Sequence, residues 1–138
     1  MYSVAEGAYH SAQDGEVLVA RGVDDDIALG VWWKRPRQHG LLYIDHENID
    51  PEEIAEFLRQ GEDGLALLVH CLGPRTERYY RRAREHIARV APILAEDVAI
   101  VTANGQQIFK KDLTMEATGA RVSYEGRRGP VGYQSYSI

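Results

Sequence analysis

The residues best suited to chemistry lie in one short passage, where an apolar run leads through Cys71 into a charged segment. Cys71 is the only cysteine of the chain and follows an expected buried strand at residues 65–69. A thiolate at a helix N-terminus beside Arg75 would have a lowered pKa and could attack an oxyanionic substrate, with Arg75 clamping the anion. The competing interpretation is a core cysteine at a strand end, because cysteines without a disulfide are among the most buried residues.

The same turn, followed by an arginine-rich helix, could bind a small anion without any reaction. Backbone N–H groups at a helix N-terminus point outward and attract negative charge. We therefore expect a ligand site formed by Arg75, Thr76, Arg78 and His46. The default interpretation of the remaining arginines is a solvated helix face, on which Glu77 and Arg81 are spaced for an ion pair.

Carboxylates at the end of an expected strand give a third possibility. Asp45 and Glu47 would share one face there, and oxygen ligands of this kind could hold Mg²⁺. The passage from Tyr43 to Asn48 resembles the first strand of PIN-like nucleases, which implies a metal-dependent nuclease. The competing interpretation is a solvated segment that caps the helix starting at Asp50.

Composition limits the classes of function. With 138 residues, 44% of them hydrophobic, and a net charge of -5, the chain suits one domain and is not built to wrap nucleic acid. One cysteine allows no internal disulfide, the first residues do not form a signal peptide, and the longest apolar run, at 65–69, cannot span a membrane. We expect a cytoplasmic protein without membrane contact. The sequence contains no nucleotide-binding motif and no metal-ligand motif, so we expect no cofactor.

The order of elements predicts the fold class. Strands are expected at 16–20, 27–33 and 41–44, forming an antiparallel meander. A helix at 50–61, a strand at 65–69, a helix at 75–91, a strand at 97–102, a helix at 106–116 and a strand at 120–124 follow. This predicts a single α/β domain over 1–125, with a mixed sheet in which the N-terminal meander precedes strand–helix alternation, and a Gly/Tyr/Ser-rich tail at 126–138.

Adjacent tryptophans add one expectation about surfaces. Trp32 and Trp33 point to opposite faces of their strand, so one of them enters the core. If no helix covers the other face, the second tryptophan would form a contact surface with Tyr133 and Tyr136.

Two further resemblances bear on function. Residues 70–76 resemble a shortened version of the anion-binding loop of rhodaneses and cysteine phosphatases, with fewer residues between Cys71 and Arg75. The segments LALLVHCLG, RRAREHIARV, DVAIVT and GARVSYE, in this order, resemble the STAS / SpoIIAA-like small α/β domains. That resemblance implies a non-catalytic regulatory or binding module. We therefore expect a binding domain that self-associates, contacts a protein partner or takes a small anionic ligand, with the cysteine enzyme and the nuclease as alternatives.

Overall fold

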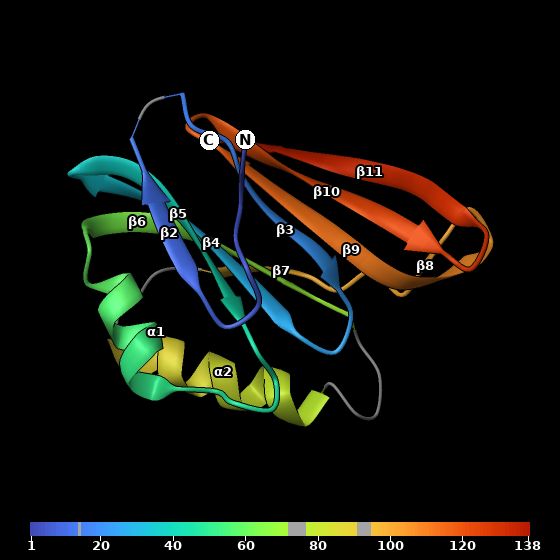
Figure 1. Cartoon of the computed structure of the whole chain (residues 1–138), viewed down its shortest axis with the longest axis horizontal. Coiled ribbons are helices and arrows are strands. Elements are labelled where there is room, and N and C mark those ends of the chain that lie inside the picture. The colour runs from blue at the N-terminus through green and yellow to red at the C-terminus, as the bar shows by residue number, and fades with distance from the viewer. Residues whose placement is uncertain (14, 72–76, 91–94) are drawn as a thin grey trace.

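The protein is built in three layers, with one sheet in the middle (Figure 1). The computed structural model describes residues 1–13, 15–71, 77–90 and 95–138. A 5-stranded sheet, sheet B, has a 6-stranded sheet, sheet A, on one face and two helices on the other. None of the helices in these ranges is long and apolar enough to cross a membrane.

Sheet A joins the start of the chain to its end. Its main strands, in spatial order, are β1 (Tyr2–Ser3), β3 (Leu18–Val23), β9 (Gln106–Glu116), β10 (Gly119–Gly126) and β11 (Gly129–Ser137). A short strand, β8 (Thr102–Ala103), pairs with the beginning of β9. Only β1 and β3 run parallel within this sheet, as far as the described residues show.

Sheet B is formed around one long hairpin. Its spatial order is β2 (Tyr9–Ala12), β5 (Arg37–Ile44), β4 (Ile27–Arg35), β6 (Glu62–His70) and β7 (Ala95–Val98). The β6–β7 pair is parallel, and α2 (Glu77–Val90) lies on the chain between these two strands. The other helix, α1 (Pro51–Leu58), follows β5 and packs beside α2.

Alternating residues of β4 enter two separate cores. Trp32 packs between the two sheets and Trp33 packs toward the helices, and both are buried. The expectation of an exposed tryptophan does not apply, because α1 and α2 cover the second face. Glycines make room for Trp33: a Cβ at Gly61 would lie 2.5 Å from its Cγ, and a Cβ at Gly40 would lie 2.8 Å from its Cζ3.

Helix α1 begins where its sequence predicts. The Asp50 carboxylate accepts hydrogen bonds from the backbone N–H groups of Glu52, at 2.9 Å, and Glu53, at 3.4 Å. Pro51 occupies the first turn, where a missing N–H costs nothing. Ile54 and Phe57 bury the apolar face of the helix against sheet B.

The predicted α/β class is wrong, because the chain is mostly β-sheet with only two described helices. The helix predicted at 106–116 is strand β9, which lies between β3 and β10. The turn Asn104–Gly105 has φ values of 50° and 74°, the signs required by a tight two-residue hairpin turn. This turn leads β8 into β9, so the residues after it continue as a strand.

The predicted N-terminal meander is also wrong in one strand. β4 and β5 form the expected antiparallel hairpin, but β3 belongs to the other sheet, between β1 and β9. The turn at 24–26 therefore carries the chain from sheet A to sheet B instead of joining neighbours. The residues after Gly126 form β11, which pairs with β10 along its length.

A fully buried lysine joins the two sheets near the end of β6. The Lys111 Nζ donates hydrogen bonds to the backbone carbonyls of His70 and Val98, the latter at 3.3 Å. Burial lowers the pKa of Lys111 to about 8, and the nearby Cys71 acts in the opposite direction. The ammonium group is thus held by two carbonyls in a site that disfavours its charge.

Replacing this lysine gives a test through the pH dependence of stability. Because the folded-state pKa of Lys111 is depressed, the unfolded chain binds more protons between pH 8 and pH 10.5, and this group makes folding more favourable as the pH rises. We expect the stability of Lys111→Met, relative to the wild-type protein, to fall by up to about 3 kcal/mol across that window. Urea unfolding at several pH values measures this difference. Lys110→Met, at an exposed position of β9, is the control.

Candidate functional site

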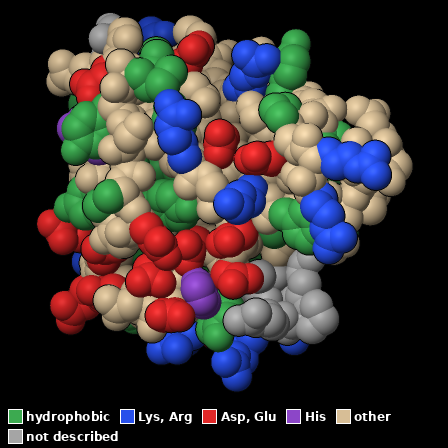
Figure 2. Space-filling view, turned by 45° about the vertical axis from the view of Figure 1, so that its right-hand side comes forward, with side chains coloured by type: hydrophobic (Ala, Val, Ile, Leu, Met, Phe, Trp, Pro, Cys, Tyr) green, Lys and Arg blue, Asp and Glu red, His purple; other side chains and the backbone are tan. Residues whose placement is uncertain are grey.

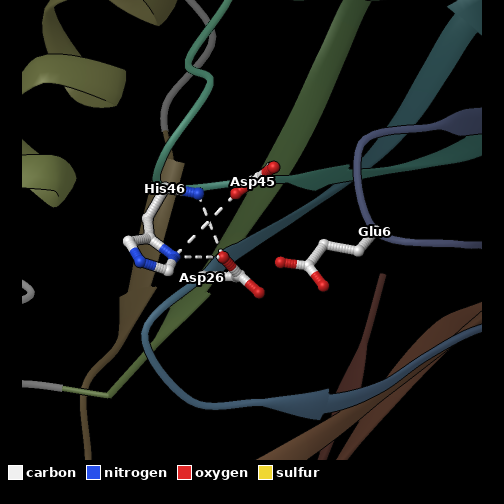
Figure 3. A group of neighbouring side chains, drawn as sticks. All are labelled: Glu6, Asp26, Asp45 and His46. Atoms are coloured by element: carbon white, nitrogen blue, oxygen red, sulfur yellow. Dashed lines mark hydrogen bonds and ion pairs between the residues drawn. The ribbon is translucent and has the colours of Figure 1, made fainter.

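Four ionisable side chains from three separate segments meet at one end of the β4–β5 hairpin (Figure 3). Glu6 comes from the turn between β1 and β2, Asp26 from the turn before β4, and Asp45 and His46 from the residues after β5. One ligand atom of each side chain lies within 4.8 Å of the others. We call these four residues the acid–histidine cluster.

Backbone geometry places each member. Gly7 adopts φ of 84° and donates its N–H to the Tyr43 carbonyl at 2.8 Å, which holds the preceding Glu6 beside the end of β5. The Asp45 carboxylate accepts the Glu47 N–H at 3.0 Å and so fixes the turn in which His46 lies. Acidic side chains gather on this part of the surface around one histidine (Figure 2).

Asp26 and His46 form the strongest contact of the cluster. One carboxylate oxygen of Asp26 lies 2.6 Å from His46 Nδ1 and also accepts the His46 backbone N–H at 3.0 Å. Asp26 is 5% exposed, so the charged pair is largely removed from water. The contact ties the turn before β4 to the segment after β5, which gives the pair a structural role.

Proton affinities within the cluster are shifted in opposite directions. A hydrogen bond with Asp26, together with burial and repulsion from Asp26 and Asp45, raises the pKa of Glu6 to about 7. Burial alone would raise the pKa of Asp26, but hydrogen bonds with Glu6 and His46 hold it below its ordinary value. The hydrogen bond to Asp26 raises the pKa of His46.

The cluster can therefore hold a proton between two carboxylates, and its donor set suits a divalent cation. Carboxylate oxygens and one imidazole nitrogen are ordinary ligands for such ions, and binding would displace protons. Of the two residues predicted to bind metal, Asp45 belongs to the cluster. Glu47 is not one of the four residues whose ligand atoms meet there; its side chain is 80% exposed and lies 3.7 Å from His46 Nε2.

The predicted anion site is only partly described. Arg75 and Thr76 lie outside the described residues. The guanidinium of Arg78 lies 5.2 Å from the centre of the Tyr79 ring, and the His46 ring contacts the same tyrosine at 5.0 Å between centroids. Tyr79 therefore separates Arg78 from the acid–histidine cluster. The predicted Glu77–Arg81 ion pair is confirmed at 2.7 Å.

Cys71 lies at the end of β6 on the side facing sheet A. Its Sγ lies 3.3 Å from the Val23 carbonyl oxygen and 3.8 Å from that of Phe109. Burial raises the pKa of the thiol above its ordinary value, although Lys111 acts in the opposite direction. His70 points the other way and stacks on Tyr80 at 4.2 Å, with its pKa lowered to about 4 by burial.

A cavity opens at the other end of the β4–β5 hairpin, about 30 Å from the cluster by strand length. It has a volume of about 440 Å³ and lies where the two sheets meet. Its apolar wall includes Trp32, Trp33, Leu65 and Ile138, and its polar rim includes Lys34 and Arg37. Trp32 Nε1 donates a hydrogen bond to the Glu116 carbonyl at 2.8 Å, which joins the sheets at the base of the cavity.

The rim cations Lys34 and Arg37 differ from Arg35, which lies between them in the chain, in their ion pairing. Arg35 forms an ion pair with Asp63 across the β4–β6 edge. Lys34 and Arg37 are exposed, and within the described parts of the chain no acidic side chain lies within ion-pair distance of either. Sequence reasoning missed this cavity because its walls come from β4, β5, β6, the β9–β10 turn and the end of β11. The only local signal was the tryptophan pair followed by a basic turn.

Comparison with known proteins gives no family assignment. No family model matches this chain, and no curated protein matches it. The similarity to STAS / SpoIIAA-like domains therefore stays a prediction.

The Asp26–His46 contact predicts a specific pH dependence. The raised pKa of His46 adds stability that is complete below pH 6.5 and is lost as the pH rises through the folded-state value. The lowered pKa of Asp26 adds stability above pH 3.8 that is lost as the pH falls. We expect Asp26→Asn to return the pKa of His46 toward 6.5 in an NMR titration and to destabilise the fold by about 1–2 kcal/mol at pH 5–6.

Glu47→Gln is the matched control for this contact, because Glu47 is exposed and contacts the same ring at a longer distance. It should change the His46 titration and the free energy of unfolding only slightly. An unchanged His46 titration in Asp26→Asn would contradict the assignment of the raised pKa to this pair.

Alkylation of Cys71 tests the cysteine-enzyme alternative. Because burial raises the thiol pKa, iodoacetamide should label the native protein about tenfold or more slowly than the unfolded chain. The apparent pKa of labelling should lie above that of an ordinary thiol. Rapid labelling with an apparent pKa well below about 8.5 would instead support a nucleophilic thiolate.

Proposed function

We propose that this protein is a non-catalytic binding domain for a small anionic ligand with an apolar body, and that it acts in the cytoplasm. The observation that carries the proposal is the cavity of about 440 Å³ between the sheets, with Lys34 and Arg37 at its rim. Its size falls in the range of small-molecule sites, which combine apolar walls with a few placed polar groups. The ligand class that fits is an aliphatic or aromatic carboxylate.

Burial of apolar surface supplies the affinity in this proposal. The faces of Trp32 and Trp33 that line the cavity are backed by the two cores, so they form a rigid wall. Leu65 is 45% exposed and Ile138 is 57% exposed, so both leave apolar surface open to the cavity. A hydrocarbon body placed here would remove this surface from water at about 25 cal/mol per Å².

Charge at the rim supplies the preference for an anion. The whole chain carries a net charge of -5, so it repels anions in general. Lys34 and Arg37 face each other across the β4–β5 hairpin and provide a local exception. A carboxylate held between them keeps its charge near water while its apolar body enters the cavity.

The alternatives receive less support from the site geometry. Burial and the raised pKa of Cys71 work against a thiolate nucleophile. In the acid–histidine cluster, hydrogen bonds between Asp26 and His46 already join two segments, which accounts for the pair without a metal.

Binding of decanoate tests the proposal, with the two tryptophans as reporters. Trp32 and Trp33 are the only tryptophans of the chain, and both line the cavity, so their fluorescence should change on titration. We expect a dissociation constant of about 100 µM at low salt for this ligand. The double variant Lys34→Gln/Arg37→Gln should bind about fivefold to tenfold more weakly, because the carboxylate loses both cations.

Two controls separate rim charge from general effects. Decanol lacks the carboxylate, so its binding should be weaker and should not respond to the double variant. Arg35→Gln removes one charge from the same hairpin, but Arg35 pairs with Asp63 and does not line the cavity, so decanoate binding should not change. An absence of any fluorescence change up to about 1 mM decanoate would contradict the proposal.

A further inference from the structure

Strand β11 is a long edge strand that carries no charge, and its one proline, Pro130, lies near its beginning. It has 9 residues, pairs only with β10 among the described strands and contains no Lys, Arg, Asp or Glu. The other edges are short: β1 has 2 residues, β2 has 4, and β7 has 4 that include Glu96 and Asp97. Natural proteins shorten or charge their edges to prevent strand addition, and β11 does neither. It forms the outer edge of sheet A, on the side away from the helices (Figure 1).

Backbone groups of alternate residues in β11 point away from the sheet. The Ile138 N–H donates to the Thr118 carbonyl at 3.1 Å, and this pair continues the β10–β11 register, in which Gly119 lies opposite Ser137. Hydrogen-bonded and non-hydrogen-bonded pairs alternate in antiparallel sheets. Gly132, Gln134 and Tyr136 therefore bond to β10, and Tyr133 and Ser135 direct their N–H and C=O groups outward.

The end of this edge is already occupied. The Asn104 side chain donates its Nδ2–H to the Val131 carbonyl at 3.0 Å. Val131 lies two residues before Tyr133 and shares its outward direction. The outward backbone groups left open are therefore those of Tyr133, Ser135 and Ser137, and a pairing about Gln134 uses the first two of these residues.

Side chains along this open segment alternate in size. A Cβ at Gly132 would have nothing within 4 Å, so the space beside it is open. Tyr136 is a large side chain four residues further, and Tyr133 is 60% exposed next to the small Ser135. In an antiparallel pairing of this strand with itself about Gln134, each large residue faces a small one.

We infer that β11 pairs antiparallel with β11 of a second copy, with Gln134 opposite the partner's Gln134. Tyr133 then exchanges backbone hydrogen bonds with the partner's Ser135, and the symmetric pair doubles them to about four. Tyr136 lies opposite the partner's Gly132, an arrangement in which an aromatic ring covers a glycine in the neighbouring strand.

A second copy fits this edge for an electrostatic reason. Two chains with a net charge of -5 each repel one another over most approaches. Pairing through β11 places no like charges directly opposite across the new strand pair, because the strand has none. Sheet A of one copy then joins sheet A of the other into one continuous sheet. The cavity beside the tryptophans is not needed for this contact.

Proline substitutions test the pairing at backbone N–H groups that the sheet of the monomer does not use. Ser135→Pro removes an outward N–H that β10 does not use, which an edge strand tolerates. Sedimentation velocity from about 1 µM to about 1 mM should show the wild-type protein approaching twice the monomer mass, and Ser135→Pro staying monomeric. Ser137→Pro, the same change at the next outward position and outside the paired centre, should still dimerise. A wild-type protein that stays monomeric throughout, or loss of the dimer in Ser137→Pro but not in Ser135→Pro, would overturn the inference.

Disulfide cross-linking tests the register and decides the matter if Ser135→Pro fails to fold. In a Cys71→Ala background, Gln134→Cys places two thiols at a non-hydrogen-bonded pair, where Cα atoms lie about 4.5 Å apart. Oxidised glutathione should convert this variant to a covalent dimer. Ser135→Cys puts the equivalent Cα atoms about 8–9 Å apart and should stay monomeric. Cross-linking of Ser135→Cys in preference to Gln134→Cys would overturn the register.

Discussion

Burial of sheet B on both faces is the constraint on which the rest of the structure depends. Its central strand β4 sends alternate residues into two cores, one shared with sheet A and one shared with the helices. Such a strand stabilises the fold twice, because each residue removes apolar surface from water on one side or the other. The hairpin it forms with β5 reaches from the acid–histidine cluster at one end to the tryptophan cavity at the other.

The central strands of sheet B, β4, β5 and β6, and the start of helix α1 were predictable because their patterns are complete within one segment. The edge strand β2 was not predicted, and β7 overlaps the strand predicted at 97–102 at only two residues. The apolar runs of β4, β5 and β6 and the capped start of α1 correspond to the structure. Strand β9 was missed because Lys111 occupies a core position, which a sequence pattern counts as surface. The Asn104–Gly105 turn carried the correct signal, since that pair favours a hairpin over a helix start. The two-residue strand β1 has too little pattern to recognise.

Sites assembled from distant segments are harder to predict than strands. Asp45 and His46 were visible as polar residues at a strand end, but Asp26 lies about 20 residues earlier in the chain and Glu6 about 40 residues earlier. Their approach depends on β3 leaving the expected meander for the other sheet. The cavity depends equally on the sheet arrangement, because Trp32 and Leu65 are lining residues only when sheet A ends beside them.

Trp33 and its two glycines form a unit with consequences for how the sequence can vary. The indole occupies space that side chains at Gly40 and Gly61 would fill, and the Gly40 position is also within 2.9 Å of Phe57. A side chain at Gly61 therefore requires a smaller residue at position 33, and a side chain at Gly40 requires space from both Trp33 and Phe57. Drift at these positions is therefore ordered, because an aromatic residue must shrink before its neighbouring glycine can be replaced.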